Sequence, residues 1–358
     1  MMKKKFNNAL AASICFGVMA AGSAQADSLL APLVISDSAL GFETLFSIKV
    51  RGNGTPNARM VAADQTDLHY TYLRKGNNIG SLFNLGQSCH HENGNGRVSS
   101  WDMINHTINP ANQWLADPFL VDNSVAFTPA TPFYGMAVID DVASLNTAGN
   151  SEGNSSGFAY VMNYFTGMML DYKLLNNHRS TVSGKFDVGF TRKTSVDLAW
   201  NPLLTDATVW LGVATGAAMT QGNSWAGSIT ISQATNTALG NVSPTIPHNG
   251  PSNPAGTGVY NNDEVNFSGD TPVNITCMGL FTRNDFLDLT QEQNTRFGGW
   301  TRKSIIGDGT FSQGGLVYKA ELKWIPSFIT NTTQISFQPE TSGHLSPSGS
   351  GPHPNRPF

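Results

Sequence analysis

The stretch Phe42-Glu43-Thr44-Leu45-Phe46-Ser47-Ile48-Lys49-Val50 decides the fold class, because its apolar and polar residues alternate. Successive side chains of a β-strand point to opposite faces of a sheet, so this alternation is typical of a strand with one buried face. The same pattern recurs along the chain, at 68–73, 185–190, 195–200, 209–213, 228–231 and 321–325. The sequence therefore predicts an all-β protein, built as an antiparallel β-sandwich or jelly roll.

The composition supports many strands that are joined by long polar loops. Charged residues make up only 13% of the chain, while Gly, Asn and Ser, which favour turns, are abundant. Helices are expected to be few and short, one beginning near residues 100–104 with Ser100 as its cap and another near 284–289 with Asn284 as its cap. Residues 161–175 suit either a buried strand pair that is broken at Gly167 or a single helix.

The first 26 residues have the three parts of an export signal. A basic start at Lys3, Lys4 and Lys5 is followed by an apolar run and by the small-residue site Ala24-Gln25-Ala26. The apolar run is too short to span a bilayer, which takes about 20 residues. Residues 1–26 are thus predicted to be a cleaved signal peptide. The expected location is the periplasm, the cell surface or the extracellular medium of a bacterium.

The charge of the chain limits its partners. Without residues 1–26 it keeps 18 basic and 25 acidic residues, a formal charge of −7, and no basic run. Nucleic acid and anionic membranes attract clustered Lys and Arg, so neither is expected as a partner. No transmembrane segment is expected. A surface polymer and self-association remain the candidate partners.

One β-sandwich domain is predicted over residues 27–339, with the Gly-, Asn- and Pro-rich loop 239–270 as the candidate boundary if there are two domains. Residues 340–358 form a Pro/Ser/Gly tail with almost no apolar side chains. Such a segment cannot repay the entropy cost of folding, so the tail is expected to be disordered.

Cys89 and Cys277 are the two cysteines that remain after the signal. An oxidising compartment permits a disulfide between them. A bond that closes so long a loop would stabilise the fold by several kcal/mol in the chain-entropy description. The alternative is a buried free thiol, for which the apolar surroundings of Cys277 argue.

The densest reactive group is Cys89-His90-His91-Glu92, with His69 upstream. Thiolate and imidazole are ligands of structural zinc, and residues 89 and 91 of one strand share a face, so Cys89, His91 and His69 are candidate metal ligands. No paired C-x-x-C or H-x-x-x-H spacing supports this site. The competing interpretation is a disulfide at Cys89, with the histidines in a polar loop and no cofactor.

Two further patterns carry weaker chemistry. Asp263, Glu264 and Asp270 offer hard oxygen ligands of the kind that calcium binds, but the segment lacks the glycine of an EF-hand loop and also suits a solvated acidic turn. Trp300 is one of several tryptophans that could form a stacking platform for sugars, or else pack in the core. Ser155 lies in a G-x-S-x-G match that follows a polar loop instead of the strand which a hydrolase elbow needs.

Three segments resemble exported, poorly characterised surface proteins of bacteria: Gly41-Phe42-Glu43-Thr44, Leu68-His69-Tyr70-Thr71-Tyr72 and Cys89-His90-His91. The resemblance covers only the first part of the chain and implies no activity. We therefore expect a non-enzymatic exported protein of the cell surface or periplasm with a structural, adhesive or ligand-binding role. The alternative is a secreted hydrolase that uses carboxylates or a metal.

Overall fold

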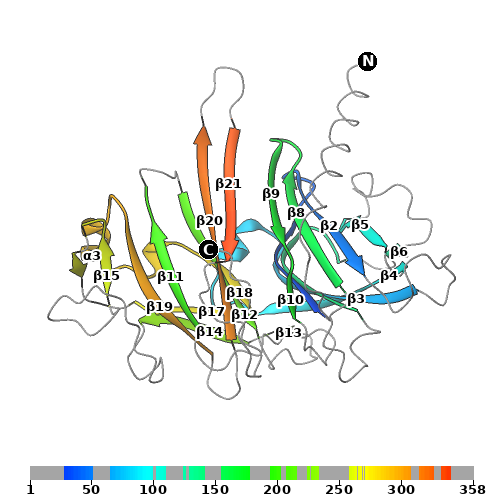
Figure 1. Cartoon of the computed structure of the whole chain (residues 1–358), viewed down its shortest axis with the longest axis horizontal. Helices are drawn as coiled ribbons and strands as arrows, with labels where there is room; N and C mark the ends of the chain where they lie inside the picture. The colour runs from blue at the N-terminus through cyan, green and yellow to red at the C-terminus, as the bar shows by residue number, and fades with distance from the viewer. Residues whose placement is uncertain are drawn as a thin grey trace, which may run out of the picture.

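Antiparallel β-strands dominate the structure, in agreement with the predicted all-β, sandwich-like fold. The computed structural model describes residues 28–50, 65–99, 102–109, 124–125, 129–141, 155–177, 194–202, 207–215, 224–225, 227–233, 258–263, 265–267, 269, 271–307, 314–325 and 332–339. Figure 1 shows strands of the N-terminal half (residues 28–177) on one side of the molecule and strands of the C-terminal half (residues 194–339) on the other. Over these residues no helix has the length and apolar character that a membrane span requires.

The N-terminal half contributes most of two sheets. The seven-stranded sheet has the order β10-β1-β7-β3-β4-β13, and β6 also pairs with β4. Its strands are β10 (Leu175–Asn177), β1 (Ser28–Ser36), β7 (Phe133–Asp141), β3 (Gln65–Gly76), β4 (Cys89–Ser99), β13 (Ser224–Trp225) and β6 (Ser124–Val125). The four-stranded sheet has the order β5-β2-β8-β9, from β5 (Met103–Thr107), β2 (Phe42–Val50), β8 (Ser155–Asn163) and β9 (Met168–Lys173).

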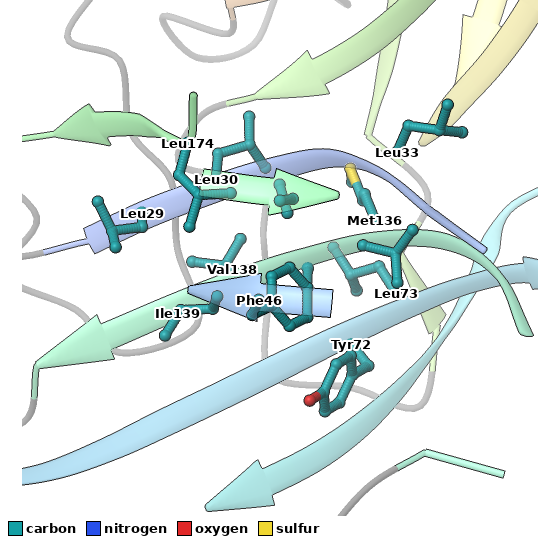
Figure 2. Close-up of a cluster of buried hydrophobic side chains, with 14 of the residues drawn as sticks. Leu29, Leu30, Leu33, Phe46, Tyr72, Leu73, Met136, Val138, Ile139 and Leu174 are labelled. Atoms are coloured by element: carbon teal, nitrogen blue, oxygen red, sulfur yellow. The ribbon is translucent and has the colours of Figure 1, made fainter. Parts of the chain in front are cut away.

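The core of this half lies between the two sheets. Every residue from 133 to 140 in β7 is buried, so the seven-stranded sheet is covered on both faces in its middle. Figure 2 shows part of the cluster, where Leu30, Val138 and Phe46 come from β1, β7 and β2. The same cluster extends to Leu211 and Met278 of the C-terminal half. Apolar burial therefore joins the two halves as well as stabilising each one.

The C-terminal half forms the other two sheets. The six-stranded sheet has the order β16-β15-β19-β14-β17, and β11 pairs with β19 along the other side of that strand. Its strands are β16 (Asn266–Phe267), β15 (Val259–Asn261), β19 (Gly299–Gly307), β14 (Ser228–Gln233), β17 (Val273–Thr276) and β11 (Thr194–Trp200). The four-stranded sheet has the order β18-β12-β20-β21, from β18 (Met278–Phe281), β12 (Ala207–Thr215), β20 (Gly314–Ile325) and β21 (Thr332–Pro339).

Aromatic rings fill the space between these two sheets. Trp200 of β11 meets Trp210 of β12 edge to face, with ring centroids 6.5 Å apart, and Phe286 lies edge-on to both. Edge-to-face packing places the positive ring edge against a negative ring face, which stabilises such a core beyond its buried area. Near the other half, β21 and β9 lie side by side in Figure 1, and the rings of Phe337 and Tyr172 are 5.3 Å apart.

Six of the seven alternating segments lie in strands, namely β2, β3, β11, β12, β14 and β20; the seventh, 185–190, is outside the described residues. The ambiguous segment 161–175 is a strand pair, with β8 and β9 joined by a turn in which Gly167 has a φ of 73°. Only glycine adopts this φ at little cost, so Gly167 suits the turn that divides the apolar segment into two strands.

The expected helices were placed wrongly. Residues 103–107 form β5, because they pair with β2 over five residues, and this pairing outweighs a local helix signal. Near the second expected position the chain forms a short 3₁₀ turn, η4 (Arg283–Asp285). Another 3₁₀ turn, η2 (Ile79–Phe83), lies between β3 and β4. The helix α3 (Leu289–Asn294) starts later, with Asp288 as its cap instead of Asn284.

The predicted signal peptide 1–26 and tail 340–358 lie outside the described residues. Most of the candidate boundary loop 239–270 does too. The strands that flank it, β14 and β17, pair with each other in one sheet. The division of 27–339 into one or two domains stays a prediction.

Candidate functional site

Cys89 and Cys277 form a buried pair at disulfide distance, as expected, with their Cα atoms 5.9 Å apart. Cys89 begins β4 in the N-terminal half, and Cys277 lies between β17 and β18 in the C-terminal half. Cys277 has a φ of 63°, in the left-handed region. Its backbone N–H donates to the carbonyl of Gly227, and its carbonyl accepts from Ala214, each at 2.8 Å, so neighbouring strands fix the turn that presents the sulfur.

Lys75 lies at the same seam, by which we mean the contact between the N-terminal and C-terminal halves at Cys89 and Cys277. Its side chain is fully buried, and its Nζ donates to the carbonyl oxygens of Gln87 and, at 2.9 Å, of Thr276. Gln87 donates back to the carbonyl of Lys75 at 2.7 Å, and the N–H of Thr276 donates to Leu85. Burial lowers the pKa of Lys75 to about 8. These hydrogen bonds therefore join the two halves beside the cysteine pair.

The structure does not bring the candidate zinc ligands together. The sulfur of Cys89 faces Cys277, and a sulfur in a disulfide cannot supply a thiolate. His91 pairs in register with Leu73 of β3, four residues along that strand from His69, a separation of about 13 Å. In the part of the chain that is described, no three His, Cys, Asp or Glu side chains are grouped to hold a metal ion. The set Cys89, His91 and His69 was therefore wrong as one site.

The remaining residues of this segment face other partners. His90 is exposed on β4. Glu92 accepts a hydrogen bond from Nε of Arg74 at 2.5 Å and another from the N–H of Ala130 at 3.1 Å. Arg74 also donates to the carbonyl of Pro132. The acid and the arginine thus fasten the loop before β7 to the sheet.

His69 instead lies beside a buried acid. Its Nδ1 is 3.7 Å from Oδ2 of Asp140, and the Oγ of Ser28 donates to Oδ1 of Asp140 at 2.6 Å. In a serine hydrolase the imidazole contacts the serine and takes its proton. Here the carboxylate contacts the serine, so this arrangement does not activate Ser28. Ser155 of the G-x-S-x-G match begins β8 and is buried beside β2.

Other titratable groups of this half are part of the core. His106 is fully buried, with its Nε2 2.8 Å from the hydroxyl of Tyr70 and its Nδ1 3.3 Å from the carbonyl of Thr107. Burial lowers the pKa of His106 to about 4 and raises the pKa of Tyr70. Glu43 is also buried and accepts from Oγ of Ser36 at 3.0 Å. These groups stabilise the interior instead of facing a ligand.

Part of the candidate calcium loop is described. Asp263 is exposed after β15, whereas Glu264 and Asp270 lie outside the described residues. The Oδ1 of Asn261 accepts from the N–H groups of Asp263 and Val265, so it closes the turn that carries Asp263. The calcium interpretation of this segment stays a prediction.

The outer face of the six-stranded sheet carries the exposed chemistry of the C-terminal half. Along β19, Thr301, Lys303 and Ile305 are buried, so Trp300 and Arg302 point outward. Trp300 is half-buried and stacks on Tyr260 of β15, its partner across the strands, with ring centroids 4.6 Å apart and planes 12° apart.

Strand β11 continues this face on the other side of Trp300. Ala199 pairs with Trp300, and Asp197 pairs with Arg302 two residues away along both strands. Nε and Nη2 of Arg302 donate to the two carboxylate oxygens of Asp197 at 2.6 and 2.7 Å, and the hydrogen bond raises the pKa of Arg302. We call the outward-facing group of Trp300, Ala199, Asp197 and Arg302 the Trp300 slot.

Sequence reasoning found only one member of this group. Trp300 was a candidate for stacking, but nothing local to it points to Tyr260, which lies 40 residues away in the sequence. The alternation in residues 195–200 does place Asp197 and Ala199 on the face opposite to the buried Trp200. The alternation therefore predicts which side chains of β11 face outward. Their neighbours on β19 follow only from the register of the two strands in the structure. No known protein family, curated protein or solved structure matches the chain.

Proposed function

We propose that this chain is an exported, non-enzymatic protein of the cell surface or periplasm with an adhesive or ligand-binding role. The observation that carries the proposal is the buried pair Cys89–Cys277, which lies at disulfide distance across the seam between the two halves. A structural disulfide forms and persists in oxidising compartments, outside the bacterial cytoplasm.

The position of the first strand is compatible with the predicted signal. Removal of residues 1–26 would leave the whole of β1, which begins at Ser28 and lies between β10 and β7 in the sheet. The low share of charged residues and the long polar loops suit a protein that presents a surface. The Trp300 slot combines an aromatic ring and a charged pair on the outer face of the six-stranded sheet.

The alternative is a secreted hydrolase. Hydrolysis with two carboxylates needs a pair of acids that flank a substrate, and hydrolysis with a metal needs grouped ligands. The buried acids Glu43 and Asp140 each accept hydrogen bonds from serine side chains inside the fold. No described geometry favours hydrolysis, so the non-enzymatic proposal stands first.

Fractionation of bacteria that make the full chain tests the proposal. We expect the protein in the periplasmic or surface fraction, cut after Ala26. Protein that stays in the cytoplasm with residues 1–26 attached would contradict the proposal.

A turnover assay on the same purified protein tests the alternative. We expect no release of chromophore from nitrophenyl glycosides, esters or peptide anilides. Turnover that Asp140→Asn abolishes, in a protein that stays folded, would replace the proposal with the hydrolase.

A further inference from the structure

The geometry points to the Trp300 slot as a binding site for a pyranose ring of a neutral glycan. This inference rests on the proposed ligand-binding function and names the class of ligand. It commits to three contacts: the indole of Trp300 on one side of the sugar, Ala199 beneath it, and the Asp197–Arg302 pair at its end.

Among the described residues the Trp300 ring has one ring partner, Tyr260. It is parallel to Tyr260, its neighbour across the strands, so the two rings stack along the direction in which strands follow one another. The opposite face of the indole therefore points towards β11. The residue there is Ala199, whose side chain is a single methyl group and is too short to cover the face of the indole.

The spacing between neighbouring strands suits a sugar ring. Neighbouring strands are about 4.8 Å apart, which is close to the thickness of a pyranose ring in contact with an aromatic face. Among the described strands β11 pairs only with β19, so the slot lies at a sheet edge.

The chemistry of the slot has the two parts that a sugar needs. The C–H groups on one face of a pyranose carry partial positive charge and pack against the negative face of an aromatic ring. Its hydroxyl groups need donors and acceptors. Each oxygen of Asp197 takes one hydrogen bond from Arg302 and keeps a lone pair, and Arg302 has donors beyond the two that it uses for Asp197.

Two polar groups of the ring stack add to this. Neither the indole N–H of Trp300 nor the hydroxyl of Tyr260 has a hydrogen-bond partner among the described residues. By contrast, the buried Trp200 donates its N–H to the carbonyl of Thr295 at 3.2 Å. The N–H of Trp300 and the hydroxyl of Tyr260 are thus available to a ligand, whereas the N–H of Trp200 is already bonded in the core.

Charge decides in favour of a neutral ligand. Asp197 and Arg302 neutralise each other, so the end of the slot is polar without a net charge. The chain without residues 1–26 is acidic, with a formal charge of −7, which disfavours anionic polysaccharides. A neutral glycan is the ligand class that meets both conditions.

Affinity electrophoresis of the purified mature protein tests the inference. Native gels contain dextran, amylose, galactomannan or mixed-linkage β-glucan, with alginate as an anionic comparison. We expect at least one neutral polymer to retard the protein. Trp300→Ala should weaken this binding about tenfold or more, since it removes the stacking face.

Two further variants separate loss of the slot from loss of the fold. Ala199→Leu keeps every binding group but is long enough to cover the face of the indole, so it should also abolish retardation while the melting temperature stays near that of the parent. Phe83→Ala removes an exposed aromatic ring from η2 in the other half and should bind like the parent.

Four outcomes would overturn the inference: no retardation by any neutral polymer, retardation by alginate alone, equal retardation of the parent and Trp300→Ala, or self-association that Ala199→Leu abolishes without any glycan binding. Equal retardation would leave the proposed ligand-binding role intact and move its site. The fractionation and turnover assays decide the proposed function separately.

Discussion

At the scale of single residues, His106 shows how the fold uses an ionisable group for stability. The ring is fully buried, and a neutral imidazole with its proton on Nδ1 can donate to the carbonyl of Thr107 while Nε2 accepts from the hydroxyl of Tyr70. Its pKa of about 4 means that the folded protein keeps this ring neutral in weak acid.

This difference predicts a loss of stability in weak acid. Below its ordinary pKa of about 6.5 the ring of the unfolded chain binds a proton that the folded chain excludes down to about pH 4. The unfolded state gains proton binding in this window, so stability is complete above pH 6.5 and falls by about 3 kcal/mol as the pH drops to 4. Denaturant unfolding across this range measures it.

The matched variant is His106→Gln, whose amide can still accept from Tyr70 but does not titrate. Between pH 6.5 and 4 its free energy of unfolding should depend less steeply on pH, by the slope that binding of one proton gives. This holds whatever the stability of the variant at about pH 7. An unchanged slope in the variant would show that His106 is not the group that excludes the proton.

Gly135 is a second residue whose identity the fold requires. A Cβ on this residue of β7 would lie 2.0 Å from the carbonyl oxygen of Leu73 in β3, a backbone atom that cannot rotate away. Gly135→Ala should therefore destabilise the protein by about 2–3 kcal/mol, because the two strands must separate.

Gly86→Ala is the control, since a Cβ there meets nothing within 4 Å. It should change the free energy of unfolding by less than about 1 kcal/mol. Equal effects of the two variants would contradict the close approach of β3 and β7.

At the scale of elements, alternation within a strand could be read from the sequence, and the partners of a strand could not. Residues 42–50 carry their pattern locally, so β2 was predictable. The strand at Met103–Thr107 was missed, because its signal is its pairing with β2, more than 50 residues away in the sequence. The stack of Tyr260 on Trp300 depends on pairing in the same way.

The site residues follow the same rule. The pair Cys89–Cys277 was predictable, because only two cysteines remain after the signal and a disulfide needs no further pattern. The zinc set was wrong, because neighbours in sequence such as Cys89 and His91 were grouped with His69 without knowledge of the register that separates them.

The cysteine pair that joins the two halves gives a further prediction. Cys277→Ser removes the cross-link between β4 and the turn before β18, which closes a sequence separation of 188 residues. The melting temperature should fall, with a loss of about 2–5 kcal/mol in the free energy of unfolding. One thiol, that of Cys89, should become reactive on unfolding, as a thiol titration measures. A variant that is as stable as the parent under oxidising conditions would show that the pair is not bonded.

At the scale of the whole molecule, one apolar cluster has members from both halves. The largest apolar cluster contains Leu73 and Met136 from one half and Leu211 and Met278 from the other. The buried amine of Lys75 and the cysteine pair lie at the same seam. The strands that carry the Trp300 slot pack their opposite face in the second apolar cluster, with Val196, Leu198 and Ile305. Ordered strands reduce the entropy cost of binding a ligand there.

We propose that the chain is exported and oxidised, and one measurement tests both: the intact mass of the protein from bacteria that make the full chain, after the protein is unfolded in denaturant with an alkylating reagent and without a reductant. We predict the mass of residues 27–358 less two hydrogen atoms, with no alkyl group attached. The mass of residues 1–358, with Cys15, Cys89 and Cys277 all alkylated, would contradict the claim.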